Sequence, residues 1–261
     1  MKTKLLKTLL LSTLLMGIVG CNSDDDNTNN GNNNDYTNEN QANETIPSNV
    51  TDALTSKKST LNQELKDSIT YMYNEEKLAK DVYLNVYKIQ PLQQLYNIAS
   101  KSEIKHEEAV NDLAIKYDLN TTLYPDTPEP YDKKALEEYG SGQYPVVAIQ
   151  ELYDILYDKG IQSEQNALEV GCMVEVTDID DLDKYMAQAT ASNASDVLTV
   201  FDFLREGSYK HYWAFDKGLK NMGVSEGCCS LGTTYCHLEY PQSENGNENG
   251  KDNGGKGNGK Q

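Results

Sequence analysis

A glutamate and a histidine stand three residues apart in the run SEIKHEEAV, residues 102–110. The surrounding segment repeats apolar residues at the spacing of a helix, and Glu103 and His106 fall on its apolar side. Residues three apart on a helix share one face, so these two side chains can contact the same ion or two neighbouring ions. Carboxylates and imidazoles that face a protein core are usually paired or bound to a metal, so metal binding is the chemistry that this pair indicates.

Three other segments place polar residues on their apolar sides at a similar depth. The helical rhythm turns Glu76 inward in one segment, Glu175 and Asp178 in another, and Ser208 and His211 in a third. Taken singly, an inward carboxylate is often solvated at the edge of a stripe, and an inward histidine is more often hydrogen-bonded than metal-bound. Together they indicate a site, because each carboxylate in a dry core would cost several kcal/mol without a cation. Mixed oxygen and nitrogen ligands suit iron or manganese better than a closed structural zinc site.

Four long segments must position these residues, and each carries the helical spacing without an internal proline. No alternation typical of strands competes with them. The region between the second and third segments is rich in proline and glycine, with short helices expected near Lys133–Tyr139 and at Val146–Lys159. The expected long helices are Leu61–Val86, Leu92–Tyr117, Ser163–Thr190 and Ser195–Met222. This pattern predicts an all-α four-helix bundle with a long crossing connection between helices two and three.

Four runs in this order resemble a bacterial ferritin-like family known as domain of unknown function 2202, which is distantly similar to rubrerythrins. The runs are EEKLAKDVY (75–83), EIKH (103–106), EVTDIDDL (175–182) and GSYKHYWAF (207–215), and the resemblance covers residues 65–222. It implies a ferritin-like bundle with a metal centre of one or two iron or manganese ions. In such centres two helices each supply a glutamate and the other two each supply Glu-x-x-His. The ligands that the resemblance assigns are Glu76, Glu103, His106, Glu175 and His211.

One position departs from that pattern. Ser208 stands three residues before His211, where a glutamate is expected. Glu206 cannot replace it, because a displacement of two residues rotates a side chain by about 200° around the helix. Asp178, one turn beyond Glu175, could supply the missing oxygen; otherwise the second metal is weakly bound or absent.

Two glycines, Gly171 and Gly207, interrupt good helical sequence near the proposed ligands, at a cost of about 1 kcal/mol each. Close approach of two helices at the site is one explanation for them, and chance is the other. Several tyrosines also flank the ligands, among them Tyr83. Packing explains most of them, and hydrogen bonding to a ligand is the alternative.

The first twenty residues have the features of an export signal. Three lysines precede the apolar run Leu9–Val19, which is too short to span a membrane. The run ends in Ile18-Val19-Gly20-Cys21, which resembles the bacterial lipobox; an ordinary signal followed by a chance cysteine is the alternative. We expect a lipoprotein signal peptide at 1–20 and lipidation of Cys21. The protein would then be exported and anchored to the cell envelope, at the outer membrane or cell surface rather than the inner membrane.

Composition divides the rest of the chain. Residues 21–58 are rich in Asn, Asp and Thr and are expected to form a disordered tether, because they can bury little apolar surface. The bundle is expected over 59–224, a cysteine-rich extension over 225–241 and a disordered tail over 242–261. The formal net charge of −18 argues against nucleic acid as a partner.

Four cysteines follow Cys21, one at Cys172 and three beyond the fourth helix. In an exported protein the default is disulfide bonding, and a bridge from Cys228 or Cys229 to Cys236 would close a short loop. A small metal site formed by these three cysteines and His237 is the alternative, although the spacing is not that of a standard zinc site.

These features favour an extracytoplasmic ferritin-like metal-binding lipoprotein, with a di-iron or di-manganese carboxylate centre that handles dioxygen, peroxide or metal ions. Whether it is an oxidase- or peroxidase-type enzyme is left open. The alternative is a non-catalytic lipoprotein for metal binding, sensing or scaffolding, with one metal ion or none. The expected partners are metal ions and, through the lipid anchor, the bilayer; formation of a homodimer is left open.

Overall fold

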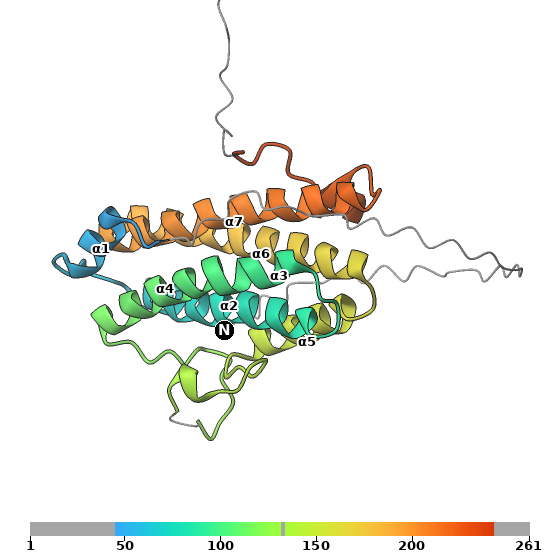
Figure 1. Ribbon diagram of the computed structural model, residues 1–261. Helices are drawn as coiled ribbons and strands as arrows, with labels where there is room; N and C mark the ends of the chain where they lie inside the picture. The colour runs from blue at the N-terminus through green and yellow to red at the C-terminus, as the bar shows by residue number, and fades with distance from the viewer. Residues whose placement is uncertain (1–44, 132–133, 243–261) are drawn as a thin grey trace, which may run out of the picture. The chain divides into compact units, whose positions relative to one another are not determined.

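The computed structural model describes residues 45–131 and 134–242. The described residues form helices and loops without any strand, so the predicted all-α class is confirmed for them (Figure 1). The predicted signal peptide, Cys21, and most of the predicted tether and tail lie outside the described residues. No described helix combines the length and apolar character needed to cross a membrane. The α-helices are α1 (Ser48–Thr55), α2 (Gln63–Tyr87), α3 (Gln93–Ile98), α4 (Ile104–Tyr117), α5 (Val147–Gly160), α6 (Glu164–Ala191) and α7 (Ser195–Asn221).

Local sequence sets where the long helices begin and end. The Asn62 side chain accepts a hydrogen bond from the Leu65 amide at 2.8 Å and begins α2. Ser163 begins α6 in the same way, through the Asn166 amide at 3.1 Å. Asp118, with a φ of 53°, ends α4 in the left-handed conformation that closes many helices. These helix ends help to determine which side of each helix, with its polar residues, faces the core.

The long helices contact one another in a consistent order. Helix α2 packs against α4 and α6, and α7 packs against α6 and α4. Helices α6 and α7 are joined by residues 192–194 only and run side by side (Figure 1). The connection from α4 to α6 is long and contains α5, which packs on α2 and α6.

The apolar core consists of two clusters separated by a polar layer. Along each long helical segment, the inward polar residues of the sequence lie between residues of one cluster and residues of the other. Representative members of the first cluster are Leu65, Val110, Leu182 and Phe201, and of the second Val82, Leu95, Leu168 and Phe215. Burial of apolar surface on both sides of the layer supports the helices that carry it.

The predicted helix Leu92–Tyr117 is interrupted. After α3 the backbone forms a π-helix, Ala99–Glu103, and then continues as α4. A π-helical turn inserts an extra residue and therefore changes the direction in which the following side chains point. Apolar spacing does not reveal such a turn, because the residues before and after it each keep an ordinary helical pattern.

Helix α1 corrects the predicted tether, whose range 21–58 includes it. Val50 is fully buried, and α1 contacts α7 and α4. Lys116 donates a hydrogen bond from Nζ to the Ala53 carbonyl at 2.7 Å and pairs with Asp196 at 2.6 Å. The tether was predicted from the low apolar content of the segment as a whole, but Val50, Ile46 and Leu54 pack against the apolar core and hold the short helix in place.

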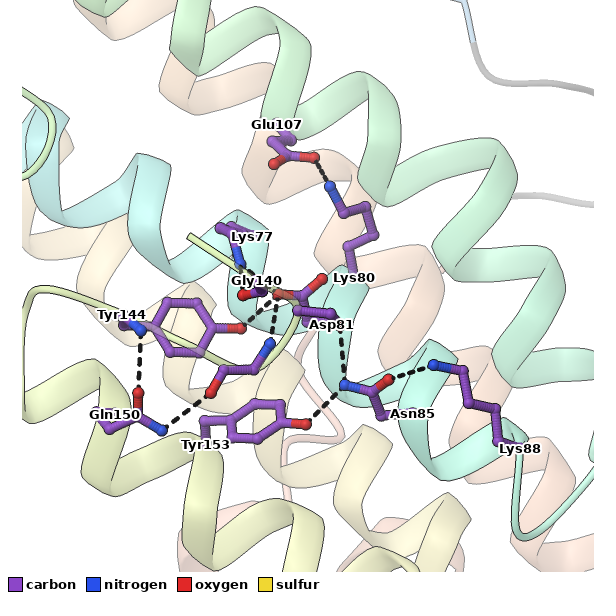
Figure 2. Close-up of polar contacts among 12 residues, drawn as sticks. Lys77, Lys80, Asp81, Asn85, Lys88, Glu107, Gly140, Tyr144, Gln150 and Tyr153 are labelled. Carbon is purple, nitrogen blue, oxygen red and sulfur yellow. Dashed lines mark hydrogen bonds and ion pairs between the residues drawn. The ribbon is translucent and has the colours of Figure 1, made fainter. Parts of the chain in front are cut away.

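The crossing connection is fastened to α2 by a buried ion pair (Figure 2). Lys77 and Asp81 pair at 2.5 Å, one turn apart on α2. Lys77 also donates to the Gly140 carbonyl at 3.1 Å, and Asp81 accepts from the Tyr144 hydroxyl at 2.9 Å. The short helix predicted near Lys133–Tyr139 is a 3-10 turn, Leu136–Glu138, whereas the predicted helix at Val146–Lys159 is present as α5.

Two disulfides hold the C-terminal extension. Cys229 is bonded to Cys236 within the extension, and Cys228 is bonded to Cys172 on α6. The four thiols are therefore paired, and none of them is available to the alternative metal site. The ring of His237 instead contacts Glu239 at 2.8 Å and the Thr234 carbonyl at 2.9 Å.

Candidate metal centre

The polar layer brings together all six residues that the sequence proposed as metal ligands. They come from α2, from the π-helix and α4, from α6 and from α7. Each is buried, with exposed fractions of 0–5%. The residues are Glu76, Glu103, His106, Glu175, Asp178 and His211.

Glu103 lies between the two histidines and turns one carboxylate oxygen toward each. Its Oε2 is 3.2 Å from Nδ1 of His106, and its Oε1 is 2.9 Å from Nδ1 of His211. The two imidazole rings are 5.4 Å apart between centroids. One ligand atom from each of these three residues can be chosen so that all lie within 4.8 Å of one another. A single ion could therefore contact all three residues.

A second carboxylate lies beside each histidine. Oε2 of Glu76 is 3.5 Å from Nδ1 of His106, and Oε2 of Glu175 is 3.5 Å from Nδ1 of His211. Nδ1 of each imidazole therefore faces both Glu103 and one further glutamate. The arrangement has two halves that share the Glu103 carboxylate, which is the geometry that a pair of neighbouring cations requires of a bridging ligand.

Several of these atoms have no hydrogen-bond partner among the described residues. They include Oε1 of Glu76 and Oδ1 of Asp178. Nδ1 of His211 and Oε1 of Glu103, in contrast, lie 2.9 Å apart as an ion pair. Buried polar atoms without partners are rare in native proteins and costly to maintain. A cation among them would use these lone pairs, so the donor set fits a metal ion.

The π-helix supplies two residues of the site. Glu103 is its last residue, and Ser102 places its hydroxyl 2.7 Å from Nε2 of His211. This contact helps to orient the ring so that Nδ1 faces Glu103 and Glu175. Short π-helical turns are frequent at functional sites. Sequence reasoning missed Ser102, because no spacing rule connects it with a histidine on another helix.

Both glycines near the site have a steric reason. A Cβ atom at Gly207 would lie 2.2 Å from Cε1 and Nε2 of His106, so only glycine lets this ring lie so close to α7. A Cβ atom at Gly171 would lie 2.3 Å from the Phe215 ring. Phe215 in turn contacts Tyr83, with ring centroids 5.2 Å apart. The Tyr83 hydroxyl donates to Oε1 of Glu175 at 2.5 Å.

Ser208 supports Asp178. Its hydroxyl lies 2.5 Å from Oδ2 of Asp178 and 3.0 Å from the Leu204 carbonyl. Both Ser208 and Asp178 are buried. Position 208, three residues before His211, is therefore occupied by a small donor that holds a carboxylate from the neighbouring helix.

Burial controls the protonation of three carboxylates in the layer. It raises the pKa of Glu76 to about 7, with a partial opposing effect from His106. Burial also raises the pKa of Glu175, and it raises the pKa of Asp178 with help from the negative charge of Glu76. In the absence of a cation, these groups reduce their mutual repulsion by holding protons.

Glu103 and His211 behave in the opposite way because they stabilise each other's charged forms. Burial acts to raise the pKa of Glu103, but His211 and His106 outweigh it and hold that pKa below its usual range. Burial acts to lower the pKa of His211, but Glu103 and Glu175 raise it to about 10. Once all four carboxylates are deprotonated they outnumber the two imidazoles, and a divalent cation can balance that excess of negative charge.

The fold and the site define an all-helical protein with a buried carboxylate–histidine cluster. Residues 65–231 match the family described as "Uncharacterized protein domain (DUF2202)", and the chain belongs to this family. It is 35% identical over 166 residues to the uncharacterized protein MJ0754 of Methanocaldococcus jannaschii, covering 64% of this chain and 80% of that protein. The crystal structure of hypothetical protein MJ0754 from Methanococcus jannaschii is similar, with a TM-score of 0.55 and 35% identity, over 65% of this chain and 87% of that one. The matched family region includes every residue of the cluster.

Proposed function

We propose that the chain is a ferritin-like metalloprotein that binds two iron or manganese ions in the polar layer. The single observation that carries this proposal is the Glu103 carboxylate, which directs one oxygen to His106 and the other to His211. Glu76 and Glu175 complete the two halves, and Asp178 supplies the oxygen that the family pattern takes from a glutamate at 208.

The proposal includes a four-helix bundle of α2, the α3–α4 segment, α6 and α7. The helix contacts support it, because each of these elements packs on two of the others. The long connection that contains α5 would be the crossing between the second and third helices of the bundle. In such bundles metal sites are built from side chains on facing helices.

A bound pair of iron or manganese ions would supply redox chemistry toward dioxygen, peroxide or ferrous ions. The chain's own residues would hold and orient the ligands: Tyr83 fixes Glu175, Ser102 fixes His211, and Ser208 fixes Asp178. The apolar clusters on both sides would exclude bulk water from the layer. Electrostatic interactions inside the layer are therefore stronger than at the surface.

The proposal places the protein outside the cytoplasm, with a lipid anchor at Cys21. It is supported by the signal-like residues 1–20 and by two disulfides in the described residues. Structural disulfides form and persist mainly in oxidising compartments. Radiolabelled palmitate would test the anchor, with Cys21→Ser as the control that should lose the label.

Metal analysis tests the function directly. The purified mature chain should contain about two iron or manganese ions, as expected for a dimetal carboxylate centre. The double variant Glu103→Ala/His106→Ala should lose bound metal, whereas the matched double variant Lys105→Ala/Asp112→Ala on the same helix should keep it. Unchanged metal content in the first variant would refute the site. Peroxide consumption and ferrous oxidation by the loaded protein then test for an enzyme.

One observation favours a second function, a non-catalytic metal-binding, sensing or scaffold protein. The three residues whose ligand atoms converge most closely, Glu103, His106 and His211, suffice for one ion, and Ser208 removes a ligand from the second. This function predicts about one ion per chain and no turnover. Stoichiometry and turnover measured on the same sample separate it from the dimetal proposal.

A further inference from the structure

A cavity of about 530 Å³ opens on the side of α2 and α4 that faces the crossing connection. Both helices line it, together with Glu137, Tyr139 and Ser141 of that connection. Much of its surface is apolar, but the lining includes charged groups: carboxylates at Asp81, Glu107, Glu108 and Glu137 and ammonium groups at Lys77 and Lys80. Asp81, Glu107 and Glu108 each pair with a lysine, the last with Lys105 at 2.6 Å. Glu137 therefore supplies the excess negative charge that attracts cations to the cavity.

Residues that line the cavity are close neighbours, along α2 and α4, of residues in the proposed metal centre. Tyr73 and Lys80 line it one helical turn before and after Glu76, on the same side of α2. Glu107 lines it and directly follows His106 on α4. Glu76 and His106 are only 2% and 0% exposed, so an ion that reaches them from solvent must pass a layer of side chains.

The Lys80–Glu107 ion pair closes the seam between the two helices at this point (Figure 2). Lys80 extends from α2 and Glu107 from α4, and their side chains are 22% and 15% exposed. Lys77 and Asp81, in contrast, are held by the crossing connection and are nearly inaccessible. A partly solvated ion pair contributes little to stability and can open by rotation of two long side chains.

We propose that this cavity is the access route for a hydrated divalent cation to the metal centre, and that the Lys80–Glu107 pair is its closure. The inference rests on the proposed function and adds the path by which the site is filled. Glu108 and Glu137 would hold the ion at the mouth, and opening of the pair would pass it to Glu76 and His106.

Co²⁺ uptake by the metal-free full-length mature chain tests the closure, measured by stopped-flow absorbance. Lys80→Ala and Glu107→Gln each break the pair, but they change the local charge in opposite directions. Both should accelerate uptake about two- to fivefold, the range set by the modest strength of such a pair, with the final stoichiometry unchanged. The charge-reversed double variant Lys80→Glu/Glu107→Lys should return uptake to the wild-type rate.

If long-range electrostatics alone set the rate, Lys80→Ala would accelerate uptake and Glu107→Gln would slow it, which overturns the closure. Equal rates in all variants overturn it as well.

The control pair Lys159–Glu169 joins α5 to α6 with similar exposure, 29% and 10%. Lys159→Ala and Glu169→Gln should leave uptake unchanged, and equal acceleration in these controls would show general loosening and overturn the route. A wild-type chain that takes up no Co²⁺ at equilibrium overturns the proposed function and this inference with it, whereas normal uptake with unaltered variant rates overturns the closure alone.

Discussion

Gly207 on α7 lies directly against the imidazole of His106 on α4, and a Cβ atom there would approach the ring to 2.2 Å. The neighbouring atoms belong to a buried ring that is also packed edge-on against Phe203, with centroids 5.3 Å apart. The ring cannot move away from a new methyl group without changing its distance to Glu103. The glycine therefore sets the position of a proposed ligand from a different helix.

Gly207→Ala should displace His106 and reduce bound metal. Alanine favours the helix by about 1 kcal/mol, but overpacking at a buried ring costs about 1–3 kcal/mol, so we expect a net loss of stability. Urea denaturation of the metal-free variant and its metal content measure the two effects. Gly218→Ala is the matched control on α7, because its Cβ would meet the flexible end of Gln94 at 2.7 Å and lies away from the ligands. Full metal content in Gly207→Ala would contradict the assignment of His106.

The contact between Ser208 and Asp178 predicts different effects for the two residues. Asp178→Ala should remove the proposed replacement oxygen and lower the metal content from about two ions to about one. Ser208→Ala should keep both ions but destabilise the protein by about 1–3 kcal/mol, because Oδ2 of Asp178 loses a buried donor. Elemental analysis and urea denaturation of both variants test this. Two ions in Asp178→Ala would show that Asp178 is not a ligand.

The raised carboxylate pKa values predict how the metal-free protein responds to pH. The pKa of Glu76 rises from 4.5 to about 7 on folding, so the folded state holds a proton that the unfolded state releases between these values. Its contribution to stability is present below pH 4.5 and is lost as pH rises toward 7. His211, whose pKa rises from 6.5 to about 10, contributes below pH 6.5 and loses that contribution as pH rises further.

Both groups therefore make the metal-free protein less stable at pH 8.5 than at pH 5.5. We expect a fall in unfolding free energy of the order of 1–3 kcal/mol, measured by urea denaturation in the presence of a chelator. Glu76→Gln should flatten the dependence between pH 5 and 7, because an amide does not titrate. If the metal-free protein became more stable between pH 5.5 and 8.5, the result would contradict the raised pKa values of Glu76 and His211 and their burial in one layer.

Much of the fold was predictable because the helices obey a strict apolar rhythm. The rhythm that places Leu65, Ile69 and Met72 in the core also turns Glu76 inward, and the structure keeps that register through the whole of α2. The same reasoning brought the six proposed ligands into one layer. The departure at Ser208 was also visible in the sequence, because a serine stands at the one position where the expected Glu-x-x-His ligand pattern lacks its glutamate.

The features that were not predictable depend on contacts between distant segments. The π-helix at Ala99–Glu103 leaves no mark in the apolar spacing, and the role of Ser102 follows from His211 on another helix. Helix α1 follows a segment of low apolar content, and Lys116 and Val50 hold it against distant elements. The pairing of Cys172 with Cys228 was one of several connectivities, and only the docking of the extension on α6 selects it.

The two disulfides predict a graded loss of stability on removal. Cys172–Cys228 closes a loop with a separation of 56 residues, and Cys229–Cys236 closes one of 7. By the loop-entropy relation, Cys172→Ser/Cys228→Ser should lower the unfolding free energy by about 4 kcal/mol, and Cys229→Ser/Cys236→Ser by about 2 kcal/mol. Urea denaturation of the metal-free variants measures both. Cys172 also stands one turn before Glu175 on α6, and Cys228 packs against the carbonyl of Tyr212, next to His211.

The first double variant should therefore weaken metal binding in the Glu175–His211 half as well, whereas the second should leave both halves intact. Isothermal titration with Mn²⁺ distinguishes the two, because a selective effect lowers the affinity of one site and spares the other. Equal affinity in both variants would show that the Cys172–Cys228 bridge stabilises the fold without positioning the ligands. A lower affinity in the second variant alone would contradict the placement of that bridge beside the centre.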